Sequence, residues 1–382
     1  MTRQRTLLLH RLMMMAGFAV MVALAILTVP VDKAAAQQSP AGEAAELPLE
    51  GGRVPGMASG PDASADMWRA IREGGVGRVQ TSNPQAGVMI QSEGDNWRAL
   101  RNGPLKTYGA WIVLGMIGLL ALFFLLRGRI RIASGWSGIM IERFNGIDRF
   151  AHWLTATTFV VLAITGLNVM FGRYLLLPLV GAEVFGMITL AGKYAHNYLA
   201  LPFALGLLLM LVLWIGHNIP NRHDVIWLLK GGGMFSSKSH PPARKFNAGQ
   251  KILFWLVILG GASLVVSGVA LMFPFQTALW ASTFGFLGDL GIDVPLAVTP
   301  MMEMQLSTLW HGVVALIMIA IILGHIYIGT LGMEGAFSAM GSGKVDLNWA
   351  REHHGLWVEE QEGRTSTQPP AGGARGVAAP AE

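Results

Sequence analysis

Hydrophobic residues gather in five long stretches along this chain, at about 108–126, 150–171, 194–217, 251–273 and 306–330. Each stretch is close to the roughly 20 residues that an α-helix needs to cross the hydrocarbon core of a bilayer. The segments between them hold most of the charged and turn-forming residues. This pattern predicts an all-α integral membrane protein with five transmembrane helices.

The chain before the first of these stretches has two parts. Residues 1–36 combine a basic start, an apolar run and three alanines before Gln37, which is typical of a signal peptide. The apolar run is long, so an uncleaved anchor is the alternative. Residues 37–107 are rich in Gly, Pro, Ala and Ser at first, and we expect a mostly extended periplasmic arm.

The loop charges predict an orientation in a bacterial inner membrane. Loops 127–149 and 218–251 are rich in Lys and Arg, which predicts a cytoplasmic location, whereas the 274–305 connection has neither residue and is predicted to be periplasmic. The tail 333–382 is then cytoplasmic, and its polar composition predicts disorder.

Composition narrows the chemistry. Hydrophobic residues make up 52% of the chain and charged residues 13%, which excludes an ordinary soluble domain. The absence of cysteine excludes cysteine-ligated iron–sulfur clusters and covalently attached c-type haem. The net charge of +5 comes from loops beside apolar stretches, and no basic stripe with interleaved aromatics indicates nucleic-acid binding.

Histidines inside the apolar stretches are the candidate ligands. His311 and His325 lie 14 residues apart, a helical rise of roughly 21 Å with a net rotation of about 40°. The predicted topology puts His325 at the depth of His152, and His311 at the depth of His196. Ionisable residues within a bilayer are costly and indicate function. Two bis-histidine sites for two b-type haems are therefore predicted, one in each leaflet.

Simpler interpretations of these histidines stay open. A single membrane histidine can hydrogen-bond a neighbouring helix, and His217 competes for the cytoplasmic site because its predicted depth matches. Nearby glycines would let a macrocycle approach or would only allow close helix packing. Basic residues near the sites would pair with haem propionates or anchor the helices at the interface. These two sets are Gly166, Gly312, Gly324 and Gly329, and Arg149, Arg173, Lys193 and Lys251.

Several segments between about 140 and 335 carry a family resemblance. They are ERFNGIDRFAHW, KYAHNYLA, WIGHNIPNRHDVIWLLKGG, KFNAGQKILFW and the last stretch with its paired histidines. The chain resembles the cytochrome b (gamma) subunit of respiratory membrane-bound formate dehydrogenases. The resemblance implies a four-helix transmembrane di-haem cytochrome b core over 150–332. The stretch 108–126 departs from the family pattern and is predicted to be one additional N-terminal transmembrane helix.

The same resemblance assigns residues to roles. It implies that His196 and His311 ligate the periplasmic haem b, and that His152 and His325 ligate the cytoplasmic one. It also implies a quinone site, for menaquinone or ubiquinone, at Asn247, Gly249 and His325. A simpler view of Asn247 is that it only caps the entry of a helix.

The implied partners are an iron–sulfur (beta) subunit and a molybdenum- or tungsten-containing catalytic (alpha) subunit that oxidises formate, beside membrane lipid. Electrons would pass from the periplasmic haem to the cytoplasmic haem and then to the quinone, and this chain would hold no formate-oxidising site.

Two alternative functions are the cytochrome b subunit of a nickel–iron hydrogenase or other periplasmic dehydrogenase, and a haem-free transporter or anchor. No inverted repeat of the transporter kind is visible.

Overall fold

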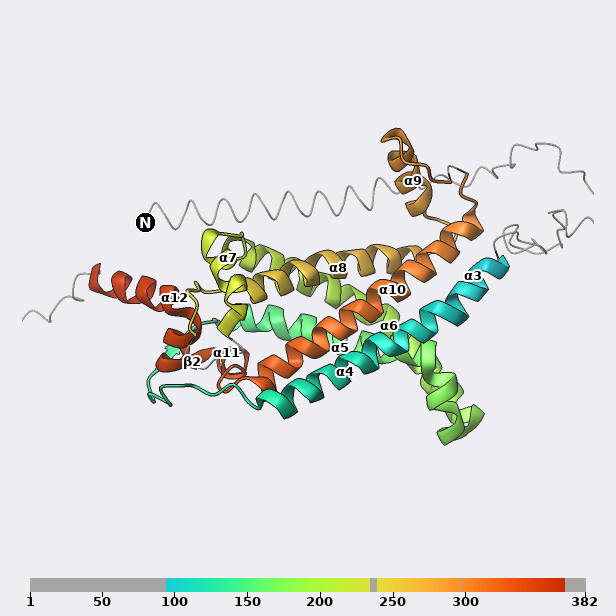
Figure 1. The fold of residues 1–382 in the computed structure, drawn as a ribbon. Coiled ribbons are helices and arrows are strands. Elements are labelled where there is room, and N and C mark those ends of the chain that lie inside the picture. The colour runs from blue at the N-terminus through green and yellow to red at the C-terminus, as the bar shows by residue number, and fades with distance from the viewer. Residues whose placement is uncertain (1–93, 234–238, 296, 368–382) are drawn as a thin grey trace, which may run out of the picture. The chain divides into compact units, whose positions relative to one another are not determined.

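The structure is a computed structural model that describes residues 94–233, 239–295 and 297–367 (Figure 1). The predicted signal peptide and most of the predicted arm lie outside these residues. Helices dominate the described part. In chain order the α-helices are α3 (Gly94–Leu100), α4 (Lys106–Arg127), α5 (Gly146–Leu175), α6 (Leu177–Trp214), α7 (Arg222–Leu229), α8 (Ala248–Met272), α9 (Leu279–Asp289), α10 (Pro300–Tyr327), α11 (Ser338–Gly341) and α12 (Leu347–Thr367).

Shorter elements join or extend these helices. They are the π-helical turns η1 (Arg101–Leu105) and η4 (Ile328–Gly332), the 3-10 turns η2 (Ile215–His217) and η3 (Gly231–Gly233), and the strands β1 (Met140–Glu142) and β2 (Lys344–Asp346).

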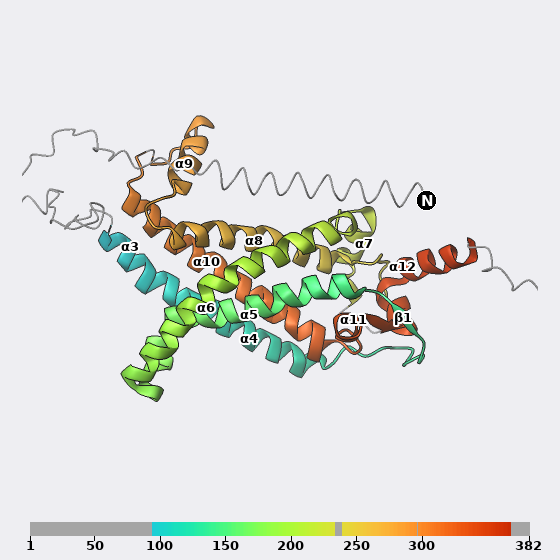
Figure 2. The same ribbon diagram turned by 180° about the vertical axis from the view of Figure 1, so that it is seen from behind.

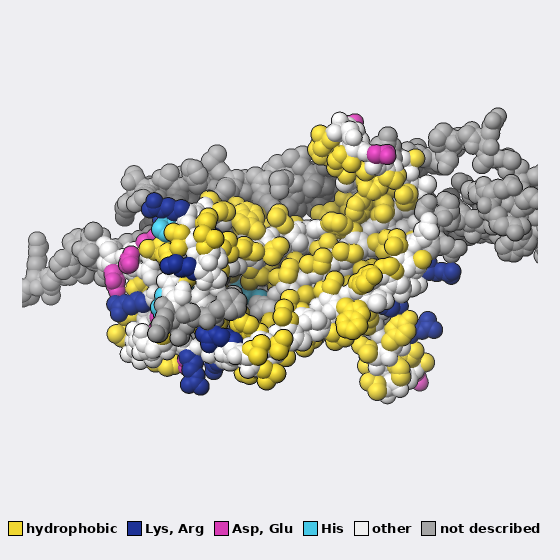
Figure 3. Space-filling model, in the orientation of Figure 1, with side chains coloured by type: hydrophobic (Ala, Val, Ile, Leu, Met, Phe, Trp, Pro, Cys, Tyr) yellow, Lys and Arg dark blue, Asp and Glu magenta, His cyan; other side chains and the backbone are white. Residues whose placement is uncertain are grey.

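Five helical segments of the described chain are long and apolar enough to cross a membrane, as the hydropathy pattern predicts. They are Asn96–Arg127, Gly146–Leu175, Leu177–His217, Ala248–Met272 and Pro300–Gly332. Large hydrophobic side chains on them are exposed, Leu125 at 80% for example, and Figure 3 shows hydrophobic side chains covering the helical surface. Such a surface suits lipid rather than water. The all-α membrane class is confirmed.

All five segments begin before the predicted starts, and the first and third do so by more than ten residues. The first begins in the expected arm and passes Pro104 in the turn η1, where the wider π-helical geometry accommodates the missing proline N–H. The third begins at Leu177 and bends at Gly181, whose φ of 79° and ψ of 170° are not helical. Hydropathy misses both extensions because polar residues at a membrane boundary end an apolar run without ending a helix.

Contacts divide the chain into two compact units, and each of the five long helices contributes to both. Of the described residues, unit 1 holds 94–115, 161–201 and 262–319, and unit 2 holds 116–160, 202–261 and 320–367.

A close approach of two helices and one buried carboxylate stabilise unit 1. A Cβ at Gly109 of α4 would meet the side chain of Leu316 of α10, so the two helices approach closely there. The buried carboxylate of Glu303 accepts hydrogen bonds from the backbone N–H groups of Trp280 (2.9 Å) and Ala281 (2.6 Å). These bonds fasten the start of α9 to α10.

Unit 2 packs α5 against α6 through another small residue. A Cβ at Gly206 would meet the hydroxyl of Thr155 and would lie 3.1 Å from its backbone nitrogen. Close by, the rings of Phe159 and Phe203 have centroids 6.0 Å apart. The close approach therefore depends on glycine at position 206.

The C-terminal segment completes unit 2, so the prediction of a disordered tail is wrong for the described residues after 333. Strand β2 pairs with β1 in antiparallel register, Met140 opposite Asp346. Figure 2 shows β1 beside α12. Trp349 of α12 is 2% exposed, and the Arg143 guanidinium lies 5.2 Å from its ring centroid. Local composition missed this because the partners of Val345 and Trp349 lie some 200 residues earlier in the chain.

Burial and hydrogen bonding shift the pKa values of groups in this C-terminal segment and of Arg143, which packs against it. Burial lowers the pKa of Arg143 to about 9 and that of His353 to about 4, and it lowers the pKa of His354 well below its usual value. Burial alone would raise the pKa of Asp346, but hydrogen bonds from Ser137 and Gly138 lower it on balance. The segment is therefore built for neutral histidines and an ionised carboxylate.

Candidate functional site

Two histidines of unit 2 face one another from different helices. His152 lies near the start of α5 and His325 near the end of α10. Their ring centroids are 6.1 Å apart, with an angle of 65° between the ring planes. The Nδ1 atom of His152 is buried and has no hydrogen-bond partner among the described residues. The structure thus brings these two residues together.

A second pair lies in unit 1 with nearly the same geometry. His196 of α6 and His311 of α10 have ring centroids 6.2 Å apart and ring planes at 61°. A Cβ at Gly166 would lie 3.6 Å from Cε1 of His196, and one at Gly268 would lie 3.5 Å from Cε1 of His311. Glycines thus line both rings of this pair.

The separation within each pair fits a shared metal ion. Two metal–imidazole bonds of about 2 Å each, with about 1 Å from each bonding nitrogen to its ring centroid, give a centroid separation of about 6 Å. No group of three or more His, Cys, Asp or Glu side chains in the described chain could hold a metal ion. Two imidazoles per site are the donor set of a low-spin b-type haem, whose macrocycle supplies the remaining ligands.

Two glycines at the C-terminal end of α10 and in the turn η4 border open space. A Cβ at Gly324 or at Gly329 would meet no atom within 4 Å. Gly312 differs, because a Cβ there would lie 3.2 Å from Leu105 and 3.4 Å from Met170. Of the four glycines singled out from the sequence, Gly312 therefore serves helix packing, Gly166 lies against a histidine, and the other two border open space.

His217, the competing candidate, lies in a different setting. Its ring stacks on Phe246, with centroids 6.3 Å apart and planes at 28°. The histidine that faces His325 at 6.1 Å is His152.

Asn247 caps the first turn of α8. Its Oδ1 accepts a hydrogen bond from the backbone N–H of Gln250 (2.9 Å), and Oε1 of Gln250 accepts one from the N–H of Asn247 (3.1 Å). This reciprocal arrangement is a capping box. A Cβ at Gly249 would lie 2.9 Å from Cη2 of Trp227, so the glycine makes room for that indole. Both residues therefore have structural roles, whatever else they bind.

Two of the basic residues considered as propionate partners are engaged within the chain. The Arg149 guanidinium donates to the carbonyl oxygens of Met340, Gly341 and Ser342 at 3.2, 2.6 and 3.3 Å. The Lys251 ammonium donates to the carbonyl of Ile219 (3.0 Å) and pairs with Asp224 (2.9 Å). These side chains hold loops of unit 2 in place.

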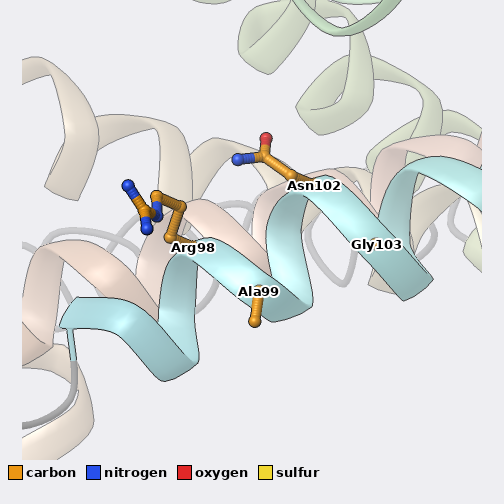
Figure 4. A pocket seen from close by; sticks show the side chains of 4 residues that line it. All are labelled: Arg98, Ala99, Asn102 and Gly103. Atoms are coloured by element: carbon orange, nitrogen blue, oxygen red, sulfur yellow. The ribbon is translucent and has the colours of Figure 1, made fainter.

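Two surface hollows of unit 1 lie apart from the histidines. One is bordered by Arg98, Ala99, Asn102 and Gly103 on α3 and η1 (Figure 4). The other is an apolar groove between α4 and α10, with Tyr108 and Leu316 among its lining residues. Neither hollow is lined by a histidine.

Two hydroxyl groups that contact the histidines of unit 1 were not predicted from the sequence. Thr165 Oγ1 lies 2.8 Å from Nδ1 of His196, and Ser267 Oγ lies 2.9 Å from Nδ1 of His311. The available signal was the repeated hydroxyl–glycine dipeptide, Thr165-Gly166 and Ser267-Gly268, on two apolar helices.

A multi-pass helical membrane protein with facing histidine pairs on its helices has the architecture of a b-type cytochrome. Comparison with known families makes this specific. The chain belongs to the prokaryotic cytochrome b561 family, whose model matches residues 143–343, just over half of the chain and all four paired histidines. This confirms the cytochrome b resemblance.

Curated relatives agree with the family. The chain is 30% identical over 225 residues to the cytochrome b556(Fdn) subunit of the nitrate-inducible formate dehydrogenase of Escherichia coli K12, covering 58% of this chain and 92% of the relative. It is 27% identical over 220 residues to the cytochrome b556(fdo) subunit of formate dehydrogenase from the same strain, with the same coverage. The corresponding Haemophilus influenzae subunit is 25% identical over 223 residues, 58% of this chain and 83% of that one.

Proposed function

We propose that this chain is the membrane cytochrome b subunit of a formate dehydrogenase complex and passes electrons from a periplasmic dehydrogenase to the quinone pool. The observation that carries the proposal is the presence of two histidine pairs, with ring centroids 6.1 and 6.2 Å apart, inside the family match. Relatives with formate dehydrogenase in their names match over most of their length, which favours formate as the electron source.

Each histidine pair would hold one haem b. His196 and His311 would ligate one iron, and His152 and His325 the other. With the macrocycle supplying the other ligands, two imidazoles would leave a haem iron no open position, which suits electron transfer. The family supports haem b as the cofactor, and the two separate pairs support a count of two.

Loop charges support an orientation for the two sites. The arginine-rich loop 127–149 belongs to unit 2, and the 274–305 connection without Lys or Arg belongs to unit 1. By the positive-inside rule, the pair of unit 2 is cytoplasmic and that of unit 1 periplasmic. His311 and His325 are 14 residues apart on the continuous helix α10, a rise of roughly 21 Å, so electron transfer between the sites would move charge across the membrane.

The quinone would bind at the first turn of α8, and the family resemblance adds His325 to Asn247 and Gly249 as a residue of this site. The first N–H groups of a helix lack partners within the helix and point outward. Asn247 uses Oδ1 for its cap, which leaves its amide nitrogen to donate a hydrogen bond to a quinone carbonyl. Gly249 would contribute its backbone N–H.

The partners of this chain would carry the remaining cofactors. The chain has no cysteine, so an iron–sulfur (beta) subunit would deliver electrons to the periplasmic site. A molybdenum- or tungsten-containing (alpha) subunit would oxidise formate.

Membranes that contain the assembled complex test this proposal. Formate is expected to reduce b-type haem and, in turn, added quinone. Replacing His311 or His325 with Ala should abolish quinone reduction, whereas replacing His223 in the first turn of α7 should leave it unchanged. Reduction by hydrogen and not by formate would favour the hydrogenase alternative. Folded protein without haem would favour a transporter or anchor and would contradict the proposal.

A further inference from the structure

The two histidines of unit 1 share a feature that the family match does not describe. Each presents Nδ1 to a hydroxyl on a different helix. His196 of α6 lies 2.8 Å from Thr165 Oγ1 of α5, and His311 of α10 lies 2.9 Å from Ser267 Oγ of α8. Four helices therefore meet at two side-chain hydrogen bonds.

The direction of these bonds follows from where each hydroxyl proton goes. Thr165 Oγ1 donates to the carbonyl oxygen of Val161 at 2.8 Å, and Ser267 Oγ donates to that of Ser263 at 2.8 Å. A hydroxyl has one proton and two lone pairs. With the proton committed to the helix, the oxygen accepts from the imidazole, so Nδ1 carries the proton and Nε2 keeps a lone pair for a metal ion. The backbone carbonyls of Leu162 and Leu264 also accept hydrogen bonds from the imidazoles of His196 and His311, so each hydroxyl acts together with a carbonyl.

Glycines complete the same arrangement on both sides. Gly166 follows Thr165, and Gly268 follows Ser267. The positions that a Cβ would occupy on these glycines lie 3.6 and 3.5 Å from Cε1 of His196 and His311 respectively. The hydroxyl therefore fixes one edge of each ring, and the glycine allows that edge to lie close to the neighbouring helix.

The pair of unit 2 differs. The Nδ1 atom of His152 is buried and has no hydrogen-bond partner within the described chain. The two candidate sites thus share a centroid separation but not the hydrogen bonding of their ligands.

Building on the function proposed above, we propose that Thr165 and Ser267 are positioning residues of the unit 1 haem site. They hold His196 and His311 with Nε2 directed at the iron and make both imidazoles more basic by accepting the Nδ1 proton. Partners of this kind fix the ring orientation of metal-bound histidines, and their loss typically costs 10–100-fold in metal affinity. A more basic ligand favours oxidised iron, so the two hydroxyls lower the midpoint potential of this site.

Optical redox titration of the assembled complex, with low-temperature paramagnetic resonance spectra, tests the assignment. Thr165→Val and Ser267→Ala are expected to raise the midpoint potential of one b-type component and alter its spectrum while the other component stays unchanged. The midpoint potential of a one-electron couple shifts by about 59 mV for each tenfold change in the ratio of the site's affinities for oxidised and reduced iron. Thr165→Ser keeps the hydroxyl and should behave as wild type.

Thr158→Val is the matched control. Thr158 lies two turns earlier on α5, is buried, and donates to the carbonyl of Leu154 in the same way, but its hydrogen bonds in the described chain involve no histidine. Unchanged potentials and spectra in Thr165→Val and Ser267→Ala would overturn the assignment, as would an equal shift in Thr158→Val.

Haem content separates the remaining outcomes. Loss of one haem in Thr165→Val but not in Thr165→Ser supports the assignment, because serine keeps the hydroxyl group and valine lacks it. Loss in both overturns it. Absence of haem from the wild-type complex would instead contradict the proposed function.

Discussion

The guanidinium of Arg143 lies 5.2 Å from the ring centroid of Trp349, although some 200 residues separate the two in the chain. Arg143 also donates to the carbonyl of Lys245 at 2.7 Å. One buried cation thus links the segment before α5, the segment before α8 and the C-terminal helix α12.

This relationship predicts the effect of Trp349→Ala. Removing a buried tryptophan should cost about 3–5 kcal/mol of local stability. Hydrogen exchange is expected to rise across 344–363, while haem content stays unchanged. The control is Trp136→Ala. Trp136 is an exposed tryptophan in the loop before β1, and its replacement should leave hydrogen exchange across 344–363 unchanged. Equal exchange in both variants would contradict the packing described for α12.

Acid should destabilise the same C-terminal segment. Burial lowers the pKa of His353 to about 4 in the folded chain, whereas an unfolded histidine has a pKa near 6.5. Between these values the unfolded state binds more protons, so stability is fully present above about pH 6.5 and is lost as the pH falls toward about 4. Hydrogen exchange across 344–363, measured from pH 7 to pH 4.5, should accelerate beyond the intrinsic chemical effect. His353→Gln should weaken that pH dependence, and an unchanged dependence in this variant would contradict the assignment.

Gly206 should tolerate no side chain. A Cβ at this position would lie 3.1 Å from the backbone nitrogen of Thr155, so a rotamer change cannot relieve the contact. Gly206→Ala is expected to destabilise the protein by about 1–3 kcal/mol, as overpacking does. Gly186→Ala on the same helix, where a Cβ would meet nothing within 4 Å, should have little effect. Thermal unfolding in detergent measures both, and equal Tm values would show that α5 and α6 do not pack closely.

The two roles considered for Asn247 can be separated. Asn247→Asp retains the oxygen that accepts from Gln250 and loses the amide N–H groups. The variant should therefore keep the wild-type Tm, because Asp is as good a helix cap as Asn. Loss of one hydrogen bond of about 0.5–1.5 kcal/mol predicts a rise of roughly 2- to 12-fold in KM for quinone. An unchanged KM would leave Asn247 as a helix cap alone.

The five membrane helices and the two histidine pairs could be predicted from the sequence for identifiable reasons. The length of an apolar stretch is enough to predict a membrane helix. The spacing of His311 and His325 on one helix limits which other histidines can lie at the same two depths in the membrane. The hydroxyls of Thr165 and Ser267 could not be predicted in the same way. Their contacts depend on helix rotation, which hydropathy does not specify in helices that are apolar all round. The order of α12 was missed because it depends on partners such as Arg143, far away in the chain.

The most direct test of the account is haem quantitation by pyridine haemochrome, with reduced-minus-oxidised spectra, on the purified wild-type chain, His311→Ala and His325→Ala. We expect two b haems in the wild type and one in each variant, with a different spectral component lost in each. Absence of haem from the folded wild-type chain, or two haems retained in either variant, would contradict the account.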